Sequence, residues 1–312
     1  MFADILFLIA GFALLVKGAD VFVDASVNIA KKLKIPSIII GLTIVSLGTS
    51  APEAVISITA SAKGANALAI GNVVGSNIFN LLIIIGICVL VKPFAVNFRN
   101  IANDIWLSVF AGIILLLMMQ LSRGYISRVF SGILLAVFIA YMIILIRKAV
   151  KSKETNGVNK ENGSKPLWAS IILSIAGCAL IISGGQLTVN GAENIASAFG
   201  ISERVIGLTI LAAGTSLPEL VTSIIACTKG ENDIALGNVV GSNIFNLLFV
   251  LGLAGIVSPL AIDVNLIFDL LVLTICSMIT ILFIYTGKRL VRPEGLTMVA
   301  LYAAYMVFIC VK

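Results

Sequence analysis

Two acidic residues, Glu53 and Glu219, lie in the middle of long apolar stretches of this chain. An ionised carboxylate at the centre of a bilayer costs roughly 2.5–3.5 kcal/mol on insertion scales, and two such groups facing each other also repel. No Lys or Arg lies near either acid in the sequence. We therefore expect a bound cation to neutralise this pair.

Both acids belong to one duplicated segment. Residues 41–80 and 207–246 align without a gap at an offset of 166, and 27 of the 40 positions are identical. The match continues upstream at the same offset, through the tripeptides Ile-Ala-Gly and Asn-Ile-Ala. A polar motif that is repeated inside hydrophobic segments is typical of a transport site.

A proline precedes each acid in the pattern Gly-Thr-Ser-x-Pro-Glu. Pro52 and Pro218 have no amide hydrogen, and each ring clashes with the carbonyl four residues back, so a helix is expected to break there. With Gly48 and Gly214, they form the predicted helix breaks. Carbonyls freed at membrane depth must be buried in protein or line a cavity, and the end of a half-helix favours a cation.

The side chains around the two motifs offer only oxygen. Two carboxylates with hydroxyls and carbonyls suit a hard cation such as Ca2+, which takes 6–8 oxygen ligands, with Na+ as a competitor. The chain has no His, and its five Cys show no CxxC spacing, so a site for a soft metal is excluded. The hydroxyl-bearing neighbours are Thr43, Thr49, Ser50 and Ser57, and Thr209, Thr215, Ser216 and Ser223.

The second repeated element, Gly-Asn-Val-Val-Gly-Ser-Asn-Ile-Phe-Asn, is identical in the two halves. Its polar residues recur every four positions on one helix face and would add neutral oxygen ligands. Asn77 and Asn243 are either further ligands or interhelical hydrogen-bond partners. The face residues are Asn72, Ser76 and Asn80, and Asn238, Ser242 and Asn246; the glycines with spacing for close helix packing are Gly71, Gly75, Gly237 and Gly241.

The composition indicates that membrane-spanning helices position these groups. Hydrophobic residues make up 60% of the chain, charged residues 12%, and the mean hydropathy is +1.14. Apolar runs of about 20 residues are long enough to cross a bilayer. We predict an all-α polytopic membrane protein whose ten spans are 2–30, 36–62, 67–91, 101–121, 125–147, 167–197, 202–227, 233–257, 262–286 and 294–311, with spans 2 and 7 broken.

The polar segment 148–166 divides the chain into two five-span halves, 1–147 and 167–312, and is expected to be a flexible cytoplasmic linker. With the N-terminus outside, 15 Lys and Arg fall on inside loops and 5 outside, which favours both termini outside. This distribution accounts for the basic balance without a nucleic-acid partner. Because five is odd, the second half is inverted relative to the first, and the two motifs face each other near the bilayer midplane.

In these motifs and this topology the chain resembles the prokaryotic sodium/calcium exchangers of the cation/Ca2+ exchanger superfamily, whose alpha repeats carry both elements. The resemblance implies four cation sites. It implies that Ca2+ binds Glu53, Glu219 and the carbonyls of Thr49 and Thr215, and that Asn80 faces the central site. Asn246 matches a position that is Asp or Asn in that family. Na+ would use Ser50, Ser76, Ser216 and Ser242 with the carbonyls of Ser46 and Ala212.

The leading hypothesis is Na+/Ca2+ antiport in the cell membrane, by a protein that functions as a monomer, without cofactors. A Ca2+/H+ antiporter is the nearest alternative, since protons could replace Na+ on the glutamates. A K+-coupled or Mg2+ exchanger is also open, although amides at both Asn80 and Asn246 weaken the case for K+. A cation channel or an enzyme fits less well, because inverted halves suit a carrier and no nucleophile–base pair is present. Asp20, Asp24 and Glu193 are expected near the membrane ends, solvated.

Overall fold

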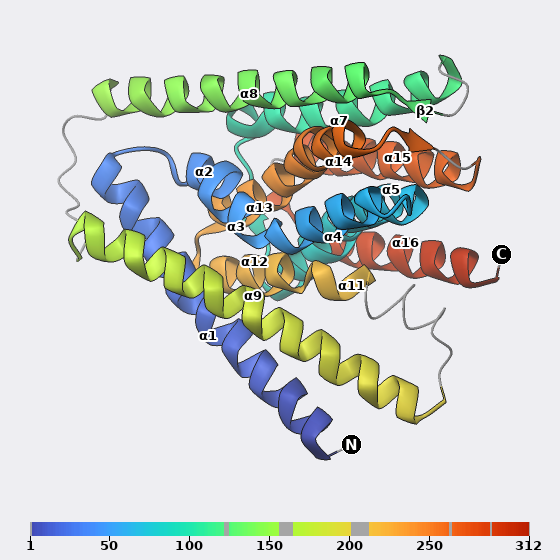
Figure 1. Ribbon diagram of the computed structural model, residues 1–312. Helices are drawn as coiled ribbons and strands as arrows, with labels where there is room; N and C mark the ends of the chain where they lie inside the picture. The colour runs from blue at the N-terminus through green and yellow to red at the C-terminus, as the bar shows by residue number, and fades with distance from the viewer. Residues whose placement is uncertain are drawn as a thin grey trace.

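The computed structural model describes residues 2–121, 125–155, 165–200, 212–261, 264–287 and 289–311. Over these ranges the protein is a bundle of long helices with two very short β-ribbons (Figure 1). The helical elements are α1 (Phe2–Leu33), α2 (Ser37–Ile40), η1 (Gly41–Val45), α3 (Ser46–Thr49), α4 (Ala51–Ala62), α5 (Asn66–Phe79), η2 (Asn80–Ile84), α6 (Ile85–Val91), α7 (Phe98–Leu121), α8 (Arg128–Thr155), α9 (Leu167–Ala198), α11 (Ala212–Thr215), α12 (Leu217–Lys229), α13 (Asn232–Ile244), η4 (Phe245–Val250), α14 (Leu251–Val257), α15 (Val264–Gly287) and α16 (Arg292–Val311).

Seven helices in the described part of the chain are long and apolar enough to cross a membrane. An eighth span results if the bent pair formed by residues 37–49 and 51–62 is counted as one. The predicted span 202–227 lies partly outside the described residues, and α16 is not among the helices that meet this measure. The protein is thus an all-helical membrane protein, with helix positions close to those expected.

The predicted break at Pro52 is confirmed. The helices before and after it are bent by 51°, and the backbone leaves helical geometry at Ser50, where φ is −84° and ψ is 7°. Pro52 then lies in the first turn of α4, the one helical position that tolerates a missing amide hydrogen. Pro218 occupies the same place in α12, after Ser216 with φ −92° and ψ 5°.

In the described part of the chain, three π-helical turns interrupt the helices around the repeated motifs, and the sequence did not predict them. η1 precedes the break, η2 begins at Asn80, and η4 contains Asn246. A π turn inserts an extra residue into the helical turn and rotates the residues on either side of it, and such turns are common at functional sites. The second repeated element therefore ends in widened turns in both halves.

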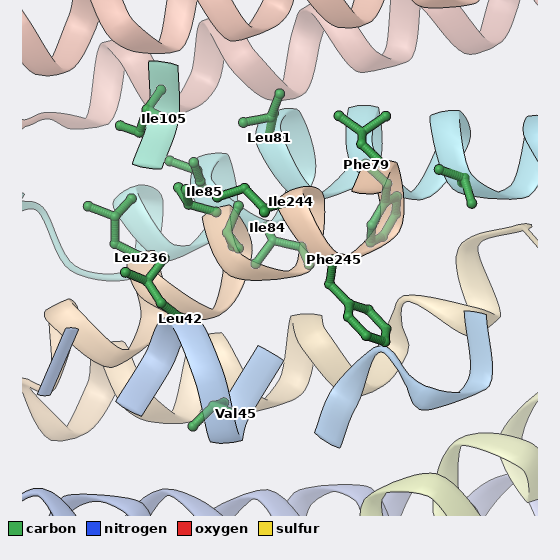
Figure 2. Packing of buried hydrophobic residues seen from close by; sticks show 14 of the residues in the cluster. Leu42, Val45, Phe79, Leu81, Ile84, Ile85, Ile105, Leu236, Ile244 and Phe245 are labelled. Atoms are coloured by element: carbon green, nitrogen blue, oxygen red, sulfur yellow. The ribbon is translucent and has the colours of Figure 1, made fainter. Parts of the chain in front are cut away.

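The interior is apolar at its helix contacts and polar at its centre. Leu42, Val45, Leu236 and Ile244 pack where η1 meets α13 and the α5–α6 helix (Figure 2). Large apolar side chains also cover the outside; Val129, for example, is 76% exposed. Such an apolar exterior would be a liability in water and suits contact with lipid tails.

α1 and α9 lie against each other beside the rest of the bundle (Figure 1). Glycines set their close approach: a Cβ on Gly184 would lie 2.7 Å from the carbonyl oxygen of Gly11, and one on Gly177 would lie 2.9 Å from that of Gly18. Any side chain at these positions would push the backbones apart, so the pair relies on glycine as small-residue membrane interfaces do.

Of the four glycines predicted to allow close helix packing, Gly237 and Gly241 lie at close helix contacts, whereas Gly71 and Gly75 do not among the described residues. A Cβ on Gly237 would lie 2.7 Å from the carbonyl oxygen of Ile38, and one on Gly241 would lie 2.7 Å from Ser46 Oγ. Near Gly71 and Gly75, no described atom would lie within 4 Å of such a Cβ. At the repeat offset, the neighbours of Gly237 and Gly241 correspond to residues 204–212. Most of that segment lies outside the described residues.

One part of the predicted fold needs correction. The helix α8 does not stop at residue 147 but continues to Thr155, because the chain supplies helix-forming Lys, Ala and Glu and no breaker before Asn156. The start of the predicted linker is therefore helical, and residues 156–164 lie outside the described part.

Short extended segments accompany the helices without changing the all-helical class. Two ribbons of two residues a strand join loops at the helix ends, where short connections bring extended backbone segments together. β1 (Phe94–Ala95) pairs antiparallel with β4 (Arg289–Leu290), with Phe94 opposite Leu290, and β2 (Tyr125–Ile126) pairs antiparallel with β3 (Leu260–Ala261), with Tyr125 opposite Ala261.

Candidate cation site

The two glutamates lie in the first turns of α4 and α12, directly after the helix breaks. Glu53 is 1% exposed and Glu219 is 0% exposed. The amide end of a helix stabilises a carboxylate in its first turn, which helps to hold these charges inside the protein. Among the described residues, no Lys or Arg forms an ion pair with either carboxylate. The described residues therefore leave this pair of carboxylates without a basic partner.

Serines of opposite halves hold the carboxylates. Ser50 donates to Glu219 Oε1 at 2.6 Å, and Ser216 donates to Glu53 Oε1 at 3.2 Å. The Ser50 hydroxyl also lies 2.8 Å from that of Ser242. Each motif thus fixes the acid of the other, and one oxygen of each carboxylate is engaged across the interface between the halves.

Asn72 and Asn238 position the backbone of the acids. Asn72 donates to Ser57 Oγ at 2.9 Å and to the carbonyl of Glu53 at 3.4 Å. Asn238 makes the two equivalent bonds in the second half, at 3.0 and 3.4 Å, and accepts the Thr49 hydroxyl at 3.0 Å. These amides were expected on the ligand face, and the structure uses them to tie α5 to α4 and α13 to α12.

Asn77 and Asn243, which the sequence left open, are interhelical hydrogen-bond partners. Each donates to the other's backbone carbonyl, at 3.1 and 3.3 Å. Their side-chain oxygens accept from Asn246 and Asn80, at 3.1 and 3.0 Å. Because these bonds occupy the NH2 groups of Asn80 and Asn246, the amide oxygens of the latter two remain free to act as ligands.

The buried oxygens left without a partner define the chemistry of the site. Several of them belong to both carboxylates and to the second repeated element, and buried acceptors without a partner are costly unless a cation binds. Among described residues no group of three or more His, Cys, Asp or Glu exists, so the neutral oxygens must complete any coordination. Among the predicted ligands, the unpartnered atoms are Glu53 Oε2, Glu219 Oε2, Ser76 Oγ, Asn80 Oδ1 and Asn246 Oδ1.

The break was expected to free carbonyls around Ser46–Thr49, a range that includes Gly48, and the carbonyls in this range differ in their surroundings. The carbonyl of Ser46 accepts the amide of Ser50 at 3.0 Å and the Thr49 hydroxyl at 3.4 Å, so it is not freed by the break. The carbonyl of Gly48, four residues before Pro52, instead accepts the thiol of Cys178 at 3.5 Å. The carbonyl freed by the break is therefore that of Gly48, because Pro52 has no amide hydrogen to donate to it.

A cavity of about 310 Å³ leads toward this region between α4, α9 and the start of α12. Thr215, Pro52 and Pro218 form part of its wall, so it reaches both helix breaks. Three polar residues of α9 line its other side, namely Gln186, Asn190 and Glu193.

Asp20 and Asp24 are partly exposed, as predicted, with 39% and 64% of their side-chain surface accessible. Their partner was not predicted: Lys229 Nζ lies 2.6 Å from a carboxylate oxygen of each. Glu193 is half-buried in the cavity wall, so its expected solvation is only partial.

Comparisons with known proteins cover nearly the whole chain. The family model described as sodium/calcium exchanger protein matches residues 4–147 and 169–311. The chain is 34% identical to the sodium/calcium exchanger MaX1 of Methanosarcina acetivorans over 97% of each chain, and 38% identical to the inner membrane protein YrbG of Escherichia coli over 82% of this chain and 80% of that protein. Its fold is similar to a solved structure of the sodium-calcium exchanger NCX_Mj, with a TM-score of 0.84 and 31% identity over 98% of each chain.

Proposed function

Because the chain belongs to the sodium/calcium exchanger family, we propose that it exchanges Na+ for Ca2+ at one shared site built around Glu53 and Glu219. Family membership makes the protein a multi-pass membrane transporter that exchanges cations with Ca2+, and not an enzyme. The identity of the counter-ion and the location of the site go beyond that assignment.

One observation carries the proposal. Each buried carboxylate has one oxygen held by a serine of the opposite half and one oxygen without any partner. Held this way, the free oxygens are preorganised to receive an ion, and the ion would join the two halves. The second repeated element contributes further side-chain oxygens without a partner. A site with many oxygen ligands suits a hard cation.

Two negative charges explain why the ions alternate. A single Ca2+ neutralises both carboxylates, and a set of Na+ ions does the same, but the two loads together would leave excess positive charge in a buried site. Neutral hydroxyls suit the smaller charge of Na+. The proposed ligands are Glu53, Glu219 and the carbonyls of Thr49 and Thr215 for Ca2+; Ser50, Ser76, Ser216 and Ser242 with the carbonyls of Ser46 and Ala212 for Na+; and Asn80 and Asn246 at the centre.

The proposed architecture is ten spans in two inverted halves, 1–147 and 167–312, joined by the segment 148–166 on the cytoplasmic side, with both termini outside. The paired bonds between equivalent residues support it, since Asn77 and Asn243 differ by the repeat offset and bond reciprocally. In this scheme α1 and α9 move as a glycine-packed pair against the remaining helices and expose the site to one side at a time.

Proton coupling is the second candidate. The full burial of both carboxylates, each with one free oxygen, would also suit protonation in place of Na+ binding. Imposed gradients separate the two: Na+ at fixed pH drives Ca2+ uptake under the proposal, whereas a pH gradient without Na+ drives it under the alternative.

The direct test measures 45Ca2+ uptake into proteoliposomes loaded with Na+. We expect uptake to be abolished in Glu53→Gln and in Glu219→Gln, because each variant leaves one charge for a divalent ion. Glu294→Gln makes the same chemical change at an exposed helix start and should retain full uptake. Full uptake in both site variants would overturn the assignment.

A further inference from the structure

The repeat offset relates two surfaces that differ in this structure. The residues of α9 that line the open cavity are Gln186, Asn190 and Glu193. Subtracting 166 gives Asp20, Asp24 and Val27 on α1. The stretch of α1 that is equivalent to this cavity wall therefore carries two carboxylates, Asp20 and Asp24, where α9 carries the amides of Gln186 and Asn190.

These two stretches lie toward opposite ends of the α1–α9 pair. A Cβ on Gly191 would lie 2.7 Å from the carbonyl oxygen of Asp4, so the cavity end of α9 packs beside the start of α1. Asp24 comes 20 residues later in the same helix, ~30 Å along its axis at 1.5 Å a residue. The two surfaces thus face opposite sides of a membrane.

Lys229 covers the α1 surface. Its ammonium lies 2.6 Å from Asp20 Oδ1 and 2.6 Å from Asp24 Oδ1, and it donates to the carbonyl of Asp20 at 3.1 Å. Three contacts use all the donors of an ammonium group. Lys229 ends α12, the helix that begins beside Glu219, so the contact joins α1 directly to a helix of the cation site.

The equivalent lysine in the first half has no such contact. Lys63 ends α4, is exposed, and forms no ion pair among the described residues. After an inverted movement it would meet Gln186 and Asn190, whose amides cannot replace the two carboxylates. Only one of the two passages therefore carries a latch of opposite charges.

The open cavity along α9 is called the α9 passage, and the equivalent route along α1, beside Asp20 and Asp24, is called the α1 passage. We propose that Lys229, held by Asp20 and Asp24, is a one-sided latch that keeps the α1 passage closed while the α9 passage is open. The proposal rests on the proposed alternating exposure of one site. Opening the α1 passage must pull α1 away from α12 and break both ion pairs, so the latch favours the state seen here. When the latch opens, the two carboxylates would line the passage and attract cations to it, as Glu193 does on the other side.

The test measures how fast a water-soluble maleimide labels a single cysteine in the purified full chain in detergent, where both sides are accessible. Val27→Cys reports the α1 passage and Glu193→Cys the α9 passage, each in a background whose native cysteines are replaced. Partly exposed ion pairs are weak, so we expect Lys229→Gln to raise the Val27→Cys rate by about threefold. The Glu193→Cys rate should not rise.

Two further variants separate a latch from general loosening. Asp20→Asn combined with Asp24→Asn should raise the Val27→Cys rate as Lys229→Gln does, because it removes both ion pairs of Lys229, together with the exposed pair between Lys17 and Asp20. Lys63→Gln, the matched change in the other half, should not raise it. An unchanged Val27→Cys rate in Lys229→Gln, or an equal rise at both reporters, would overturn the proposal. The labelling uses no Na+ gradient, so a failure of Na+ coupling would be seen separately in the flux assay.

Discussion

Replacing Asn77 by alanine tests how the site holds its neutral ligands. Asn77 accepts from the amide of Asn246 at 3.1 Å and donates to the carbonyl of Asn243 at 3.1 Å. Only the first bond orients a proposed ligand; the second joins the helices. Without Asn77, the NH2 group of Asn246 loses its partner, and its amide oxygen is no longer fixed toward a cation.

The magnitude follows from that single bond. Interhelical hydrogen bonds in a membrane protein average about 0.6 kcal/mol and reach about 1.7 kcal/mol. If this free energy is lost from Ca2+ binding alone, the Ca2+ concentration that half-saturates uptake should rise about 3- to 16-fold at 1.4 kcal/mol per factor of ten. The maximal rate should change less, because the carboxylates stay in place.

The assay is a double-mutant cycle on Ca2+ uptake in proteoliposomes. Asn246→Ala removes the ligand itself, so combining it with Asn77→Ala should raise half-saturation no further than Asn246→Ala alone. Asn243→Ala should behave like Asn77→Ala, since it holds Asn80 in the same way. Fully additive effects of Asn77→Ala and Asn246→Ala would refute the reasoning, because Asn77 would then act independently of Asn246.

Three further predictions concern single positions. Gly237→Ala puts a Cβ 2.7 Å from the Ile38 carbonyl oxygen, so it should lower the thermal unfolding temperature and exchange, whereas Gly132→Ala, with no described atom within 4 Å, should leave both intact. Ser50→Ala removes a 2.6 Å bond to a carboxylate, worth about 1.5–3 kcal/mol. It should raise half-saturating Ca2+ about tenfold or more, and Ser216→Ala, which loses a 3.2 Å bond, should raise it less; the reverse order would contradict the geometry. Asn246→Asp adds a third negative charge, so Ca2+ uptake should come to depend on an added monovalent cation; an unchanged response to K+ would contradict this.

The elements of the fold were predictable where one residue decides the local structure. Proline fixes the break before each glutamate, because a missing amide hydrogen acts regardless of surroundings. The span positions followed from hydropathy in the same way. The π turns at Asn80 and Asn246 were not predictable, since they depend on how neighbouring helices pack and leave no residue signature of their own.

For the candidate site, the sequence identified the polar residues but not their pairing. Ser50 was a predicted Na+ ligand, yet its bond to Glu219 arises from contact between segments 169 residues apart. The two roles open for Asn77 and Asn243 were separated only by the reciprocal bonds. Asp24 and Lys229 looked like unrelated membrane-end charges until the fold placed α1 beside α12.

Equilibrium Ca2+ binding to the purified protein tests the shared site most directly. The protein should bind a single Ca2+ in the absence of Na+, added Na+ should displace it competitively, and Glu53→Gln and Glu219→Gln should each abolish binding. Calorimetry with Na+ titrated at constant ionic strength, using K+ as the replacement salt, separates competition from screening. Ca2+ binding that persists undiminished in saturating Na+, or in both glutamine variants, would contradict one site serving both ions.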